Sequence, residues 1–483
     1  MRLSATATAA KNRTGQTGQA RRWWILAIAA TAQLMVVLDG TVVNVALPTA
    51  QADLGFSDAS RQWVVTVYSL AFGSLLLICG RLGDRFGQRR AFVVGLIGFG
   101  AASAAGGWAP DLAVLLAARA VQGAFGALLA PAALSILTVT FSDAKDRAKA
   151  FGIYGAVASS GGAVGLLLGG VLTSYLSWRW CLYVNVVFAA AAVVAALVFL
   201  PRTARTAAYG RTDWLGTVLV IGGLFAVVLG FGQSETQGWA GVGTLVPLGV
   251  GVLLLLAFVA VELRTLDPLL PMRILLDRVR GTSYLVMLLA AVGLYAIYLF
   301  LAYYLQRTLG YPAILAGIAF LPMAICTSLT STLSSSLLIP RFGLRMQTPL
   351  AAAVATAGLI YLSTISTHAN YLGGVLPGLI AAGVGLGALI SAATASATLG
   401  VQPDKAGVAS AVLNTSQQVG GAIGIAALSS ISLAASTSYT ATNSVADAAA
   451  NAPVAGYHAA FLAAAVALAA AGIIGLRYPK RRR

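Results

Sequence analysis

Residues 34–48 read LMVVLDGTVVNVALP, and they place one carboxylate, Asp39, inside an apolar run that extends from Trp23 to near Pro48. A charged side chain in a membrane-spanning helix costs about 2.5–3.5 kcal/mol on insertion scales, so its presence there indicates a function. All the other acidic residues of the chain fall in or beside expected loops and helix ends. We therefore expect Asp39 to bind and release protons. The alternative is a structural acid that faces a polar cavity and pairs with a buried arginine.

The composition predicts a polytopic helical membrane protein. Of 483 residues, 59% are hydrophobic and only 9% are charged, which excludes an ordinary soluble domain. Fourteen apolar segments follow one another along the chain, at residues 23–47, 62–80, 90–109, 111–134, 150–173, 181–200, 214–233, 241–263, 282–306, 312–338, 347–367, 372–397, 406–433 and 455–477. The sequence thus predicts fourteen transmembrane helices.

The distribution of charge predicts the orientation. Among the 31 Lys and Arg residues, only Arg61, Arg179 and Arg307 fall in loops assigned to the outside, and Arg119 lies within a helix. The others fall in the tails and the alternate loops, which the positive-inside rule places in the cytoplasm. Both termini are then cytoplasmic, which requires an even number of helices. Because this explains the net charge of +17, nucleic acid is not an expected partner.

Other functional classes lack their signatures. No lysine follows a glycine, so the chain has no GK[ST] phosphate loop and no sign of an ATP-driven pump. The three cysteines, Cys79, Cys181 and Cys326, lie in or beside apolar segments and have neither disulfide nor metal-ligand spacing. We expect no metal and no cofactor, with a proton gradient as the energy source.

An internal repeat divides the chain into two similar halves. DRFGQRR at 84–90 matches PRFGLRM at 340–346, FGALLAPAA at 125–133 matches LGALISAAT at 386–394, and SGGAVG ending at Gly165 matches VGGAIG ending at Gly424. The three matches occur in the same order at offsets of 256, 261 and 259 residues. Parallel repeats of this kind are typical of transporters with a substrate site between the halves.

The repeat and the polar segments between the apolar runs predict a domain organisation. We expect an irregular cytoplasmic tail and, near the other end, a mobile external connector at 434–454. The segment 264–281 is too charged to span the membrane and suits a short interfacial helix. The predicted divisions are a tail at 1–22, an N-terminal six-helix bundle at 23–200, a linker at 201–213, an inserted helix pair at 214–263, the interfacial segment at 264–281, a C-terminal six-helix bundle at 282–477 and a basic tail at 478–483.

Four stretches carry a resemblance to a known family. They are LDGTVVNVALP at 38–48, GRLGDRFGQRR at 80–90, LAARAVQGAFGALLAP at 116–131 and a glycine series from Gly161 to Gly170. Together they resemble the major facilitator superfamily, specifically its fourteen-helix drug:proton antiporters, and the resemblance extends from Trp23 to the last helix. It implies an all-α polytopic fold of two six-helix bundles plus an inserted pair. It also implies that Asp39 binds protons and cationic substrates.

The second stretch resembles the superfamily's loop between helices 2 and 3, which implies a conformational latch. Glycines permit a tight turn, an acid can cap the next helix, and arginines can contact helix ends and the other half. The residues assigned to this latch are Gly80, Gly83, Asp84, Arg85, Gly87, Arg89 and Arg90. A basic loop that only sets topology would explain the arginines but not the spacing of Gly and Asp.

The third stretch places Arg119 and Gln122 one turn apart in a predicted helix. A cation in the membrane needs a counter-charge or hydrogen-bonded carbonyls, and Asp39 is its embedded acidic candidate. The resemblance implies that Arg119 couples protonation to movement. The alternative is a structural arginine bonded to backbone carbonyls.

The glycine series predicts close helix packing. Gly161, Gly165 and Gly169 recur every fourth residue, with Gly170 beside them, and form one smooth face. The series resembles the family's antiporter motif, in which a proline occupies the position of Leu166, so this chain lacks the proline bend.

Uncharged polar and aromatic residues are further candidates for the transport pathway. Asn44 could supply a hydrogen bond in the cavity or a contact between helices. Tyr295 and Tyr298, one turn apart, could bind flat lipophilic cations, although such tyrosines also occur at membrane interfaces. Asn414 and Gln417 could face the pathway from a later helix.

These observations favour an exporter that exchanges protons for lipophilic, cationic drugs or secondary metabolites by alternating access. We expect a monomer in the bacterial cytoplasmic membrane, because the bias towards Ala, Gly and Arg is typical of a GC-rich bacterium. The alternatives are a proton-coupled or facilitative importer of a small metabolite, a membrane enzyme that uses Asp39, and a receptor that transports nothing. No second embedded acid, metal cluster or large soluble loop supports the enzyme.

Overall fold

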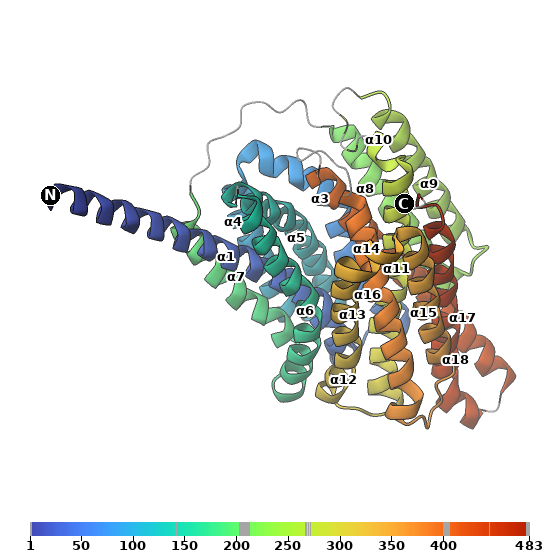
Figure 1. The fold of residues 1–483 in the computed structure, drawn as a ribbon. Coiled ribbons are helices and arrows are strands. Elements are labelled where there is room, and N and C mark those ends of the chain that lie inside the picture. The colour runs from blue at the N-terminus through green and yellow to red at the C-terminus, as the bar shows by residue number, and fades with distance from the viewer. Residues whose placement is uncertain are drawn as a thin grey trace.

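The computed structural model describes residues 2–141, 143–201, 213–265, 268, 270, 272–398, 406–443 and 445–479 of the 483-residue chain. Every regular element in these ranges is a helix (Figure 1). The first part contains α1 (Arg2–Leu54), α2 (Asp58–Arg61), α3 (Trp63–Phe86), α4 (Gln88–Trp108), α5 (Leu112–Thr140), α6 (Ala144–Tyr175) and α7 (Trp180–Phe199). The middle part contains α8 (Trp214–Gln237), α9 (Val242–Glu262) and α10 (Met272–Leu275).

The last part of the chain contains longer helices interrupted by π-helical turns. Its elements are α11 (Arg278–Ala296), η1 (Ile297–Leu301), η2 (Tyr304–Thr308), α12 (Ala313–Ala319), α13 (Leu321–Leu333), η3 (Ser334–Leu338), α14 (Ile339–Phe342), α15 (Leu344–Leu362), η4 (Tyr371–Val375), α16 (Leu376–Thr398), α17 (Ala406–Thr442) and α18 (Val445–Gly475). The η elements are π-helical, a geometry that is rare and often found at functional sites.

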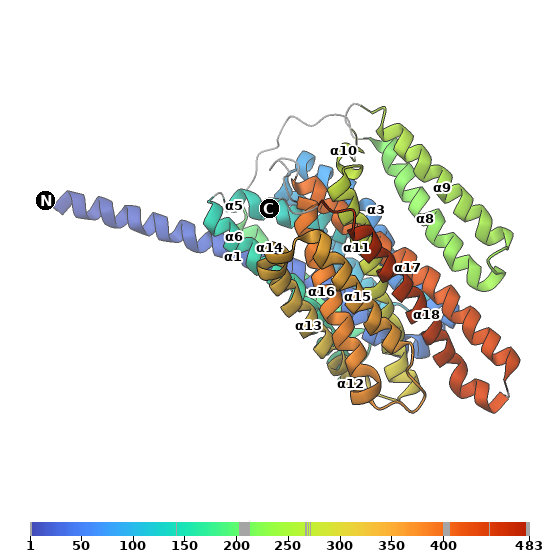
Figure 2. The ribbon, with the colours of Figure 1, turned by 45° about the vertical axis from the view of Figure 1, so that its right-hand side comes forward.

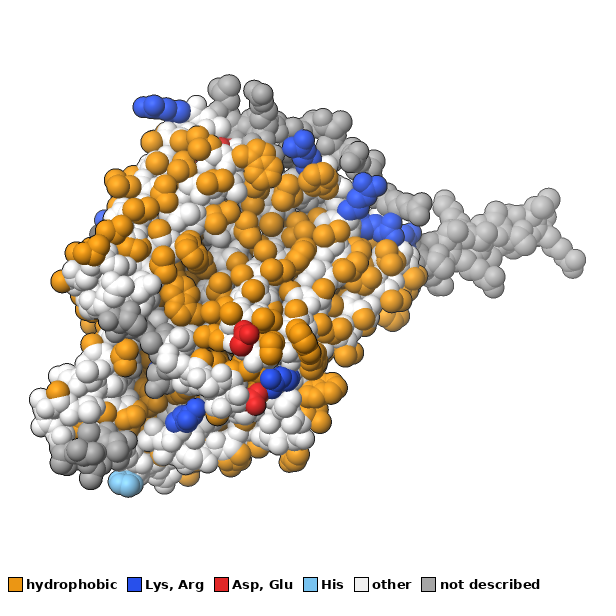
Figure 3. Space-filling view, turned by 180° about the vertical axis from the view of Figure 1, so that it is seen from behind, with side chains coloured by type: hydrophobic (Ala, Val, Ile, Leu, Met, Phe, Trp, Pro, Cys, Tyr) orange, Lys and Arg blue, Asp and Glu red, His pale blue; other side chains and the backbone are white. Residues whose placement is uncertain are grey.

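The helices have the length and composition of membrane spans. Eleven helical stretches in the described ranges are long and apolar enough to cross a membrane. Each predicted apolar segment falls on helix, including the shorter apolar stretches within α3 and α6 and the less apolar α15. Figure 3 shows a face largely covered by hydrophobic side chains, with Lys and Arg side chains along its upper edge and others near acidic side chains in its lower part. The chain is a multi-pass membrane protein.

The helices form two packed groups and a peripheral pair. In the first group α1 packs against α5, α6 and α7, and α5 packs against α3 and α4. In the second group α11 packs against α16, α17 and α18, and α15 against α16 and α18. The groups meet through α3 with α17 and through α6 with α12 and α13. Helices α8 and α9 pack against each other and touch the rest mainly through α8, so they stand at the edge of the molecule (Figure 2).

Two segments that we expected to be irregular are helical. Helix α1 begins at Arg2, so the segment before Trp23 continues the first helix and projects from the body (Figure 1). Helix α17 extends to Thr442 and α18 begins at Val445, so most of the expected connector at 434–454 is helical rather than irregular. That stretch is rich in alanine, which has the highest helix propensity. The interfacial segment contains the short helix α10, whereas most of the 201–213 linker and the end of the basic tail lie outside the described residues.

Equivalent glycines turn the chain in the two halves. Gly87 has φ of 95° between α3 and α4, and Gly343 has φ of 73° between α14 and α15. Glycine occupies this left-handed region without the steric cost that a Cβ atom brings. The two positions correspond in the repeat DRFG and PRFG, so the structure gives both copies the same turn.

The glycine series on α6 lies against α1, the helix that carries Asp39. A Cβ atom on Gly161 would lie 3.1 Å from a side-chain carbon of Val37, and one on Gly169 would lie 2.8 Å from a side-chain carbon of Val42. Gly170 faces the other half, where its Cβ would lie 2.7 Å from the backbone of Ile314. Close packing through small residues is how membrane helices approach each other. The series therefore fixes the position of α1.

Adding one methyl group to this series tests the packing. A Cβ on Gly165 would lie 2.0 Å from Thr41 Oγ1, whereas a Cβ on Gly162 would lie 3.7 Å from its nearest neighbour, the Tyr298 hydroxyl. We expect Gly165→Ala to lower the free energy of unfolding by about 1–3 kcal/mol, the usual range for overpacking. Thermal unfolding in detergent measures this, with Gly162→Ala as the matched control. Equal stability of the two variants would contradict the proposed packing.

Candidate functional site

Asp39 lies in α1 and is completely buried. Its Oδ2 atom accepts a hydrogen bond from Arg119 Nη1 at 2.5 Å, which is also an ion pair. Its Oδ1 atom accepts hydrogen bonds from Gln122 Nε2 at 2.7 Å and from Asn185 Nδ2 at 2.8 Å. The ion pair with Arg119 that the sequence indicated is present, and both carboxylate oxygens are hydrogen bonded.

Arg119 lies in α5 and is only 1% exposed. Besides Asp39, its guanidinium donates to Gln122 Oε1 at 2.7 Å and to the backbone oxygen of Val64 at 3.2 Å. Its Cζ atom lies 4.2 Å from the centre of the Tyr68 ring on α3, which is a cation–π contact. Arg119 therefore has both kinds of partner that the sequence allowed, an acid and a backbone carbonyl.

Ser103 on α4 closes the network. Its hydroxyl accepts hydrogen bonds from Gln122 Nε2 and Asn185 Nδ2, each at 3.1 Å, and donates to the backbone oxygen of Leu182 at 2.8 Å. The polar side chains of Asp39, Ser103, Arg119, Gln122 and Asn185 are each no more than 1% exposed. We call these five residues the buried polar network. It joins α1, α4, α5 and α7, all in the first group of helices.

The network makes the burial of two charges tolerable. Desolvating a carboxylate and a guanidinium costs several kcal/mol for each ion, and the attraction between them offsets this only when the remaining hydrogen-bonding positions are filled. Here the side-chain amides of Gln122 and Asn185 donate to the carboxylate, while Gln122 Oε1 and the backbone oxygen of Val64 accept from the guanidinium. Removing the charge of one partner would leave the other buried and uncompensated.

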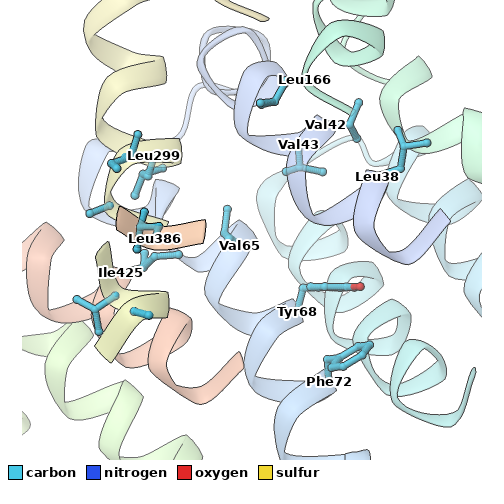
Figure 4. Close-up of a cluster of buried hydrophobic side chains, with 14 of the residues drawn as sticks. Leu38, Val42, Val43, Val65, Tyr68, Phe72, Leu166, Leu299, Leu386 and Ile425 are labelled. Atoms are coloured by element: carbon cyan, nitrogen blue, oxygen red, sulfur yellow. The ribbon is translucent and has the colours of Figure 1, made fainter. Parts of the chain in front are cut away.

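Asp39 points into the first group of helices rather than towards the second. All of its partners come from α5 and α7. Asn44 is five residues further along α1, which is about 140° around a helix of 3.6 residues per turn. Figure 4 shows Leu38 and Val42 on the side of α1 away from Leu299 and Leu386 of the second group. The expectation that Asp39 contacts substrate directly is not supported by this geometry.

The other predicted pathway residues do not join the buried polar network. Asn44 is 1% exposed and its amide nitrogen donates to Gly40 O at 2.8 Å on its own helix. The Tyr295 hydroxyl donates to Gln418 Oε1 at 3.0 Å, and the Tyr298 ring lies edge-on to Phe320. Asn414 and Gln417 are half-buried on α17.

The latch residues lie at the α3–α4 turn. Helix α3 continues through Asp84 to Phe86, and Gly87 precedes α4. The side chain of Asp84 lies outside what the structure describes, so its predicted capping of the next helix stays a prediction. Arg89 donates to the backbone oxygen of Leu197 at 2.9 Å, which lies near the end of α7 as expected of a basic residue there. Gly80 and Gly83 lie within the last turns of α3, and Arg85 and Arg90 are exposed.

The site predicted from the sequence did not include Ser103, Asn185 or Tyr68. Asn185 had a recognisable signal, because it is the only amide in the apolar helix α7. Ser103 and Tyr68 had none, since serine and tyrosine are common in membrane helices. Among the residues that the structure describes, no group of three or more His, Cys, Asp or Glu side chains could hold a metal ion.

A double-mutant cycle tests the ion pair. We expect Arg119→Leu to destabilise the protein by about 3–5 kcal/mol, because it leaves a buried carboxylate uncompensated. Adding Asp39→Leu should recover much of that loss, because the double variant buries no charge. Chemical unfolding in detergent gives the free energies. Strictly additive losses would show that the two charges do not stabilise each other.

Known proteins share both the sequence and the fold. Residues 29–425 match the family model of the Major Facilitator Superfamily. The chain is 49% identical to a puromycin resistance protein of Streptomyces alboniger over 431 residues (89% of this chain and 85% of the relative). It is 42% identical to a cephamycin export protein of Amycolatopsis lactamdurans over 410 residues, which is 83% of each chain.

Solved structures give the same fold. A bacterial homologue of the human lysosomal transporter Spinster, in an inward-facing unoccupied conformation, superposes with a TM-score of 0.67 at 18% identity and covers 94% of this chain and 96% of that one. The packed helices, the sequence match and this likeness agree. The chain belongs to the Major Facilitator Superfamily and is a transporter rather than an enzyme.

Proposed function

We propose that this transporter exports lipophilic drugs or secondary metabolites from a bacterial cell in exchange for protons. The observation that carries the coupling is the completely buried Asp39–Arg119 pair, which protonation of one group would break. Export is supported by the relatives, which include puromycin resistance, cephamycin export, and tetracenomycin C resistance and export proteins. No cofactor is needed, because the proton gradient supplies the energy.

We further propose fourteen membrane-spanning helices with both termini in the cytoplasm of the cell, and a monomer as the working unit. The support is that helix covers each of the fourteen apolar segments, and that the basic residues concentrate in the tails and alternate loops. The membrane is then the bacterial cytoplasmic membrane, with the C-terminal end of α1 on the outside.

The proposed mechanism couples one charge to two conformations. A proton that reaches Asp39 from outside removes the counter-charge of Arg119, which must then find other partners within the bundle. Release of the proton to the inside restores the pair. A proton that moves down the membrane potential provides about 2.3 kcal/mol per 100 mV. This energy can support a substrate concentration ratio across the membrane on the order of tens to one.

The two halves are hydrogen bonded at the proposed outer end. Gln51 Oε1 accepts a hydrogen bond from the Tyr303 hydroxyl at 2.8 Å, and the Arg61 guanidinium covers the same ring at 4.3 Å. Gln306 and Arg307 on η2 donate to the backbone oxygens of Val45 and Pro48 in α1 at 3.0 and 3.2 Å. These contacts close the outer end in this conformation.

A transport assay tests the function. Proteoliposomes with an imposed proton gradient should move puromycin or ethidium, and Asp39→Asn should abolish gradient-driven movement because asparagine binds no exchangeable proton. Asp111→Asn is the matched control, since Asp111 only caps α5 by accepting from Val114 N, and asparagine caps equally well. Full coupling in Asp39→Asn would contradict proton exchange at this site.

A second prediction concerns the outer end. Tyr303→Phe removes the hydrogen bond to Gln51 while keeping the ring under Arg61. One such bond contributes about 0.5–1.5 kcal/mol, so the population of the outward-open conformation should rise by roughly two- to tenfold. Alkylation of a cysteine placed at Ala50, buried here, measures that opening. An unchanged alkylation rate would show that this bond does not hold the outer end closed.

A further inference from the structure

We propose that a proton from outside reaches Asp39 through a water-sized cavity inside the first group of helices, and that Trp178 is the lid of this cavity. The lid opens only when the outer ends of the two groups separate. This inference rests on the proposed function and goes beyond it, because it gives the proton its own route, apart from the interface between the groups.

The cavity lies between the buried ion pair and the outer end of the first group. Arg119, about two helical turns after the start of α5, lines it at one end, and Trp178, in the turn between α6 and α7, lines it at the other. Helix α1 supplies one apolar wall, and every residue of that wall follows Asp39 along the helix. The wall residues are Val43, Ala46, Leu47 and Ala50. The cavity therefore extends from the proton site towards the proposed outer side.

The cavity has room and a donor for one water molecule. The centre of a water molecule has about 10 Å³ in which to lie, which is at the lower limit for one buried water. The Nε and Nη1 atoms of Arg119 donate to Val64 O, Asp39 and Gln122, whereas Nη2 has no acceptor among the residues that the structure describes. Buried N–H groups without an acceptor are costly. Because Arg119 lines the cavity, a water there supplies the acceptor.

Asp39 keeps one acceptor position for that water. A carboxylate has about four lone-pair positions, and the hydrogen bonds from Arg119, Gln122 and Asn185 fill three of them. Two of these bonds are on Oδ1, so the remaining position is on Oδ2, the oxygen that Arg119 binds. When an incoming proton joins the water oxygen, one of the water's own O–H bonds breaks and that proton forms a new O–H bond on Asp39. The water is thereby regenerated.

Trp178 separates the cavity from the outer surface. Its side chain is only 4% exposed, and its indole Nε1 donates to Asp53 Oδ2 at 2.9 Å. The Asp53 side chain is 46% exposed, so this bond lies at the surface. Arg179 forms an ion pair with the same carboxylate oxygen, and its guanidinium lies 4.5 Å from the centre of the Trp178 ring. These contacts hold the lid closed.

The bond that holds the lid is next to a contact between the two groups. Asp53 binds Trp178, and two residues earlier Gln51 accepts a hydrogen bond from Tyr303 of the second group at 2.8 Å. Both residues are in the last turn of α1, which ends at Leu54. Separation of the groups at the outer end would free this turn and, with it, the lid. A proton would then enter only in the outward-open conformation, so the closed outer end would not leak protons.

Infrared spectroscopy of proteoliposomes with the outer end facing the bathing solution tests the lid. A disulfide between cysteines placed at Ser174 and Ile314 holds the groups together there, since Ile314 N donates to Ser174 Oγ at 3.1 Å. In the cross-linked protein Asp39 should gain a proton only slowly after the external pH is lowered. Trp178→Ala should raise that rate by about tenfold or more, the effect of losing the hydrogen bond that closes the lid. Adding Ala46→Leu, which fills the cavity, should return the rate towards that of the cross-linked parent.

The matched control is Trp180→Ala, because Trp180 is two residues away but 45% exposed and does not line the cavity. Thermal unfolding verifies that each variant is folded. Cys181, a buried wall residue, should react with a small membrane-impermeant thiol reagent from outside in Trp178→Ala but not in the control.

Two outcomes would overturn the route while the proton site stands, provided that Asp39 still titrates in the protein without the disulfide. One is an unchanged protonation rate in a folded Trp178→Ala protein, and the other is a Cys181 that stays unreactive there. An Asp39 that no pH change protonates, even without the disulfide, would instead contradict the proposed function and the route together.

Discussion

The structure depends on one buried ion pair. Asp39 and Arg119 lie in the core of the first helix group, where neither charge is hydrated, and each is tolerated only because the other is 2.5 Å away and amides fill the remaining positions. Such a pair contributes little net stability, but its loss is expensive. That asymmetry is what the proposed coupling uses, because a proton on Asp39 would leave Arg119 without its counter-charge.

The surrounding fold serves this pair in two ways. The glycine series on α6 lets α1 approach closely, so that Asp39 is held among α4, α5 and α7 and shielded from the second group. Towards its C-terminal end, α1 contacts the second group through Gln51, Val45 and Pro48, which accept hydrogen bonds from Tyr303, Gln306 and Arg307. One helix thus carries the proposed proton site and part of the interface between the two groups, which is the interface that alternating access would move.

The sequence predicted the charged centre and missed its polar shell, for physical reasons. A charge in an apolar run is conspicuous because it is costly, so Asp39 and Arg119 could be paired without coordinates. Ser103 and Tyr68 carry no such cost, and only the fold shows that Tyr68 lies under Arg119 and that Ser103 accepts a hydrogen bond from Gln122. The end of one helix was harder to predict, because the apolar segment ends near residue 80, but α3 continues to Phe86. The face of α1 that contacts the second group could not be predicted either, because it depends on how the helices pack.

Infrared difference spectroscopy during a pH titration reports the protonation of a single carboxyl group, and so it tests whether Asp39 exchanges a proton. Spectra of the parent are compared with those of Asp39→Asn, which lacks the band of interest. The account predicts that the carboxylate band of Asp39 converts to a protonated carboxyl band within the pH range of transport, together with a shift of the Arg119 guanidinium bands. An Asp39 that stays ionised while transport proceeds would contradict it.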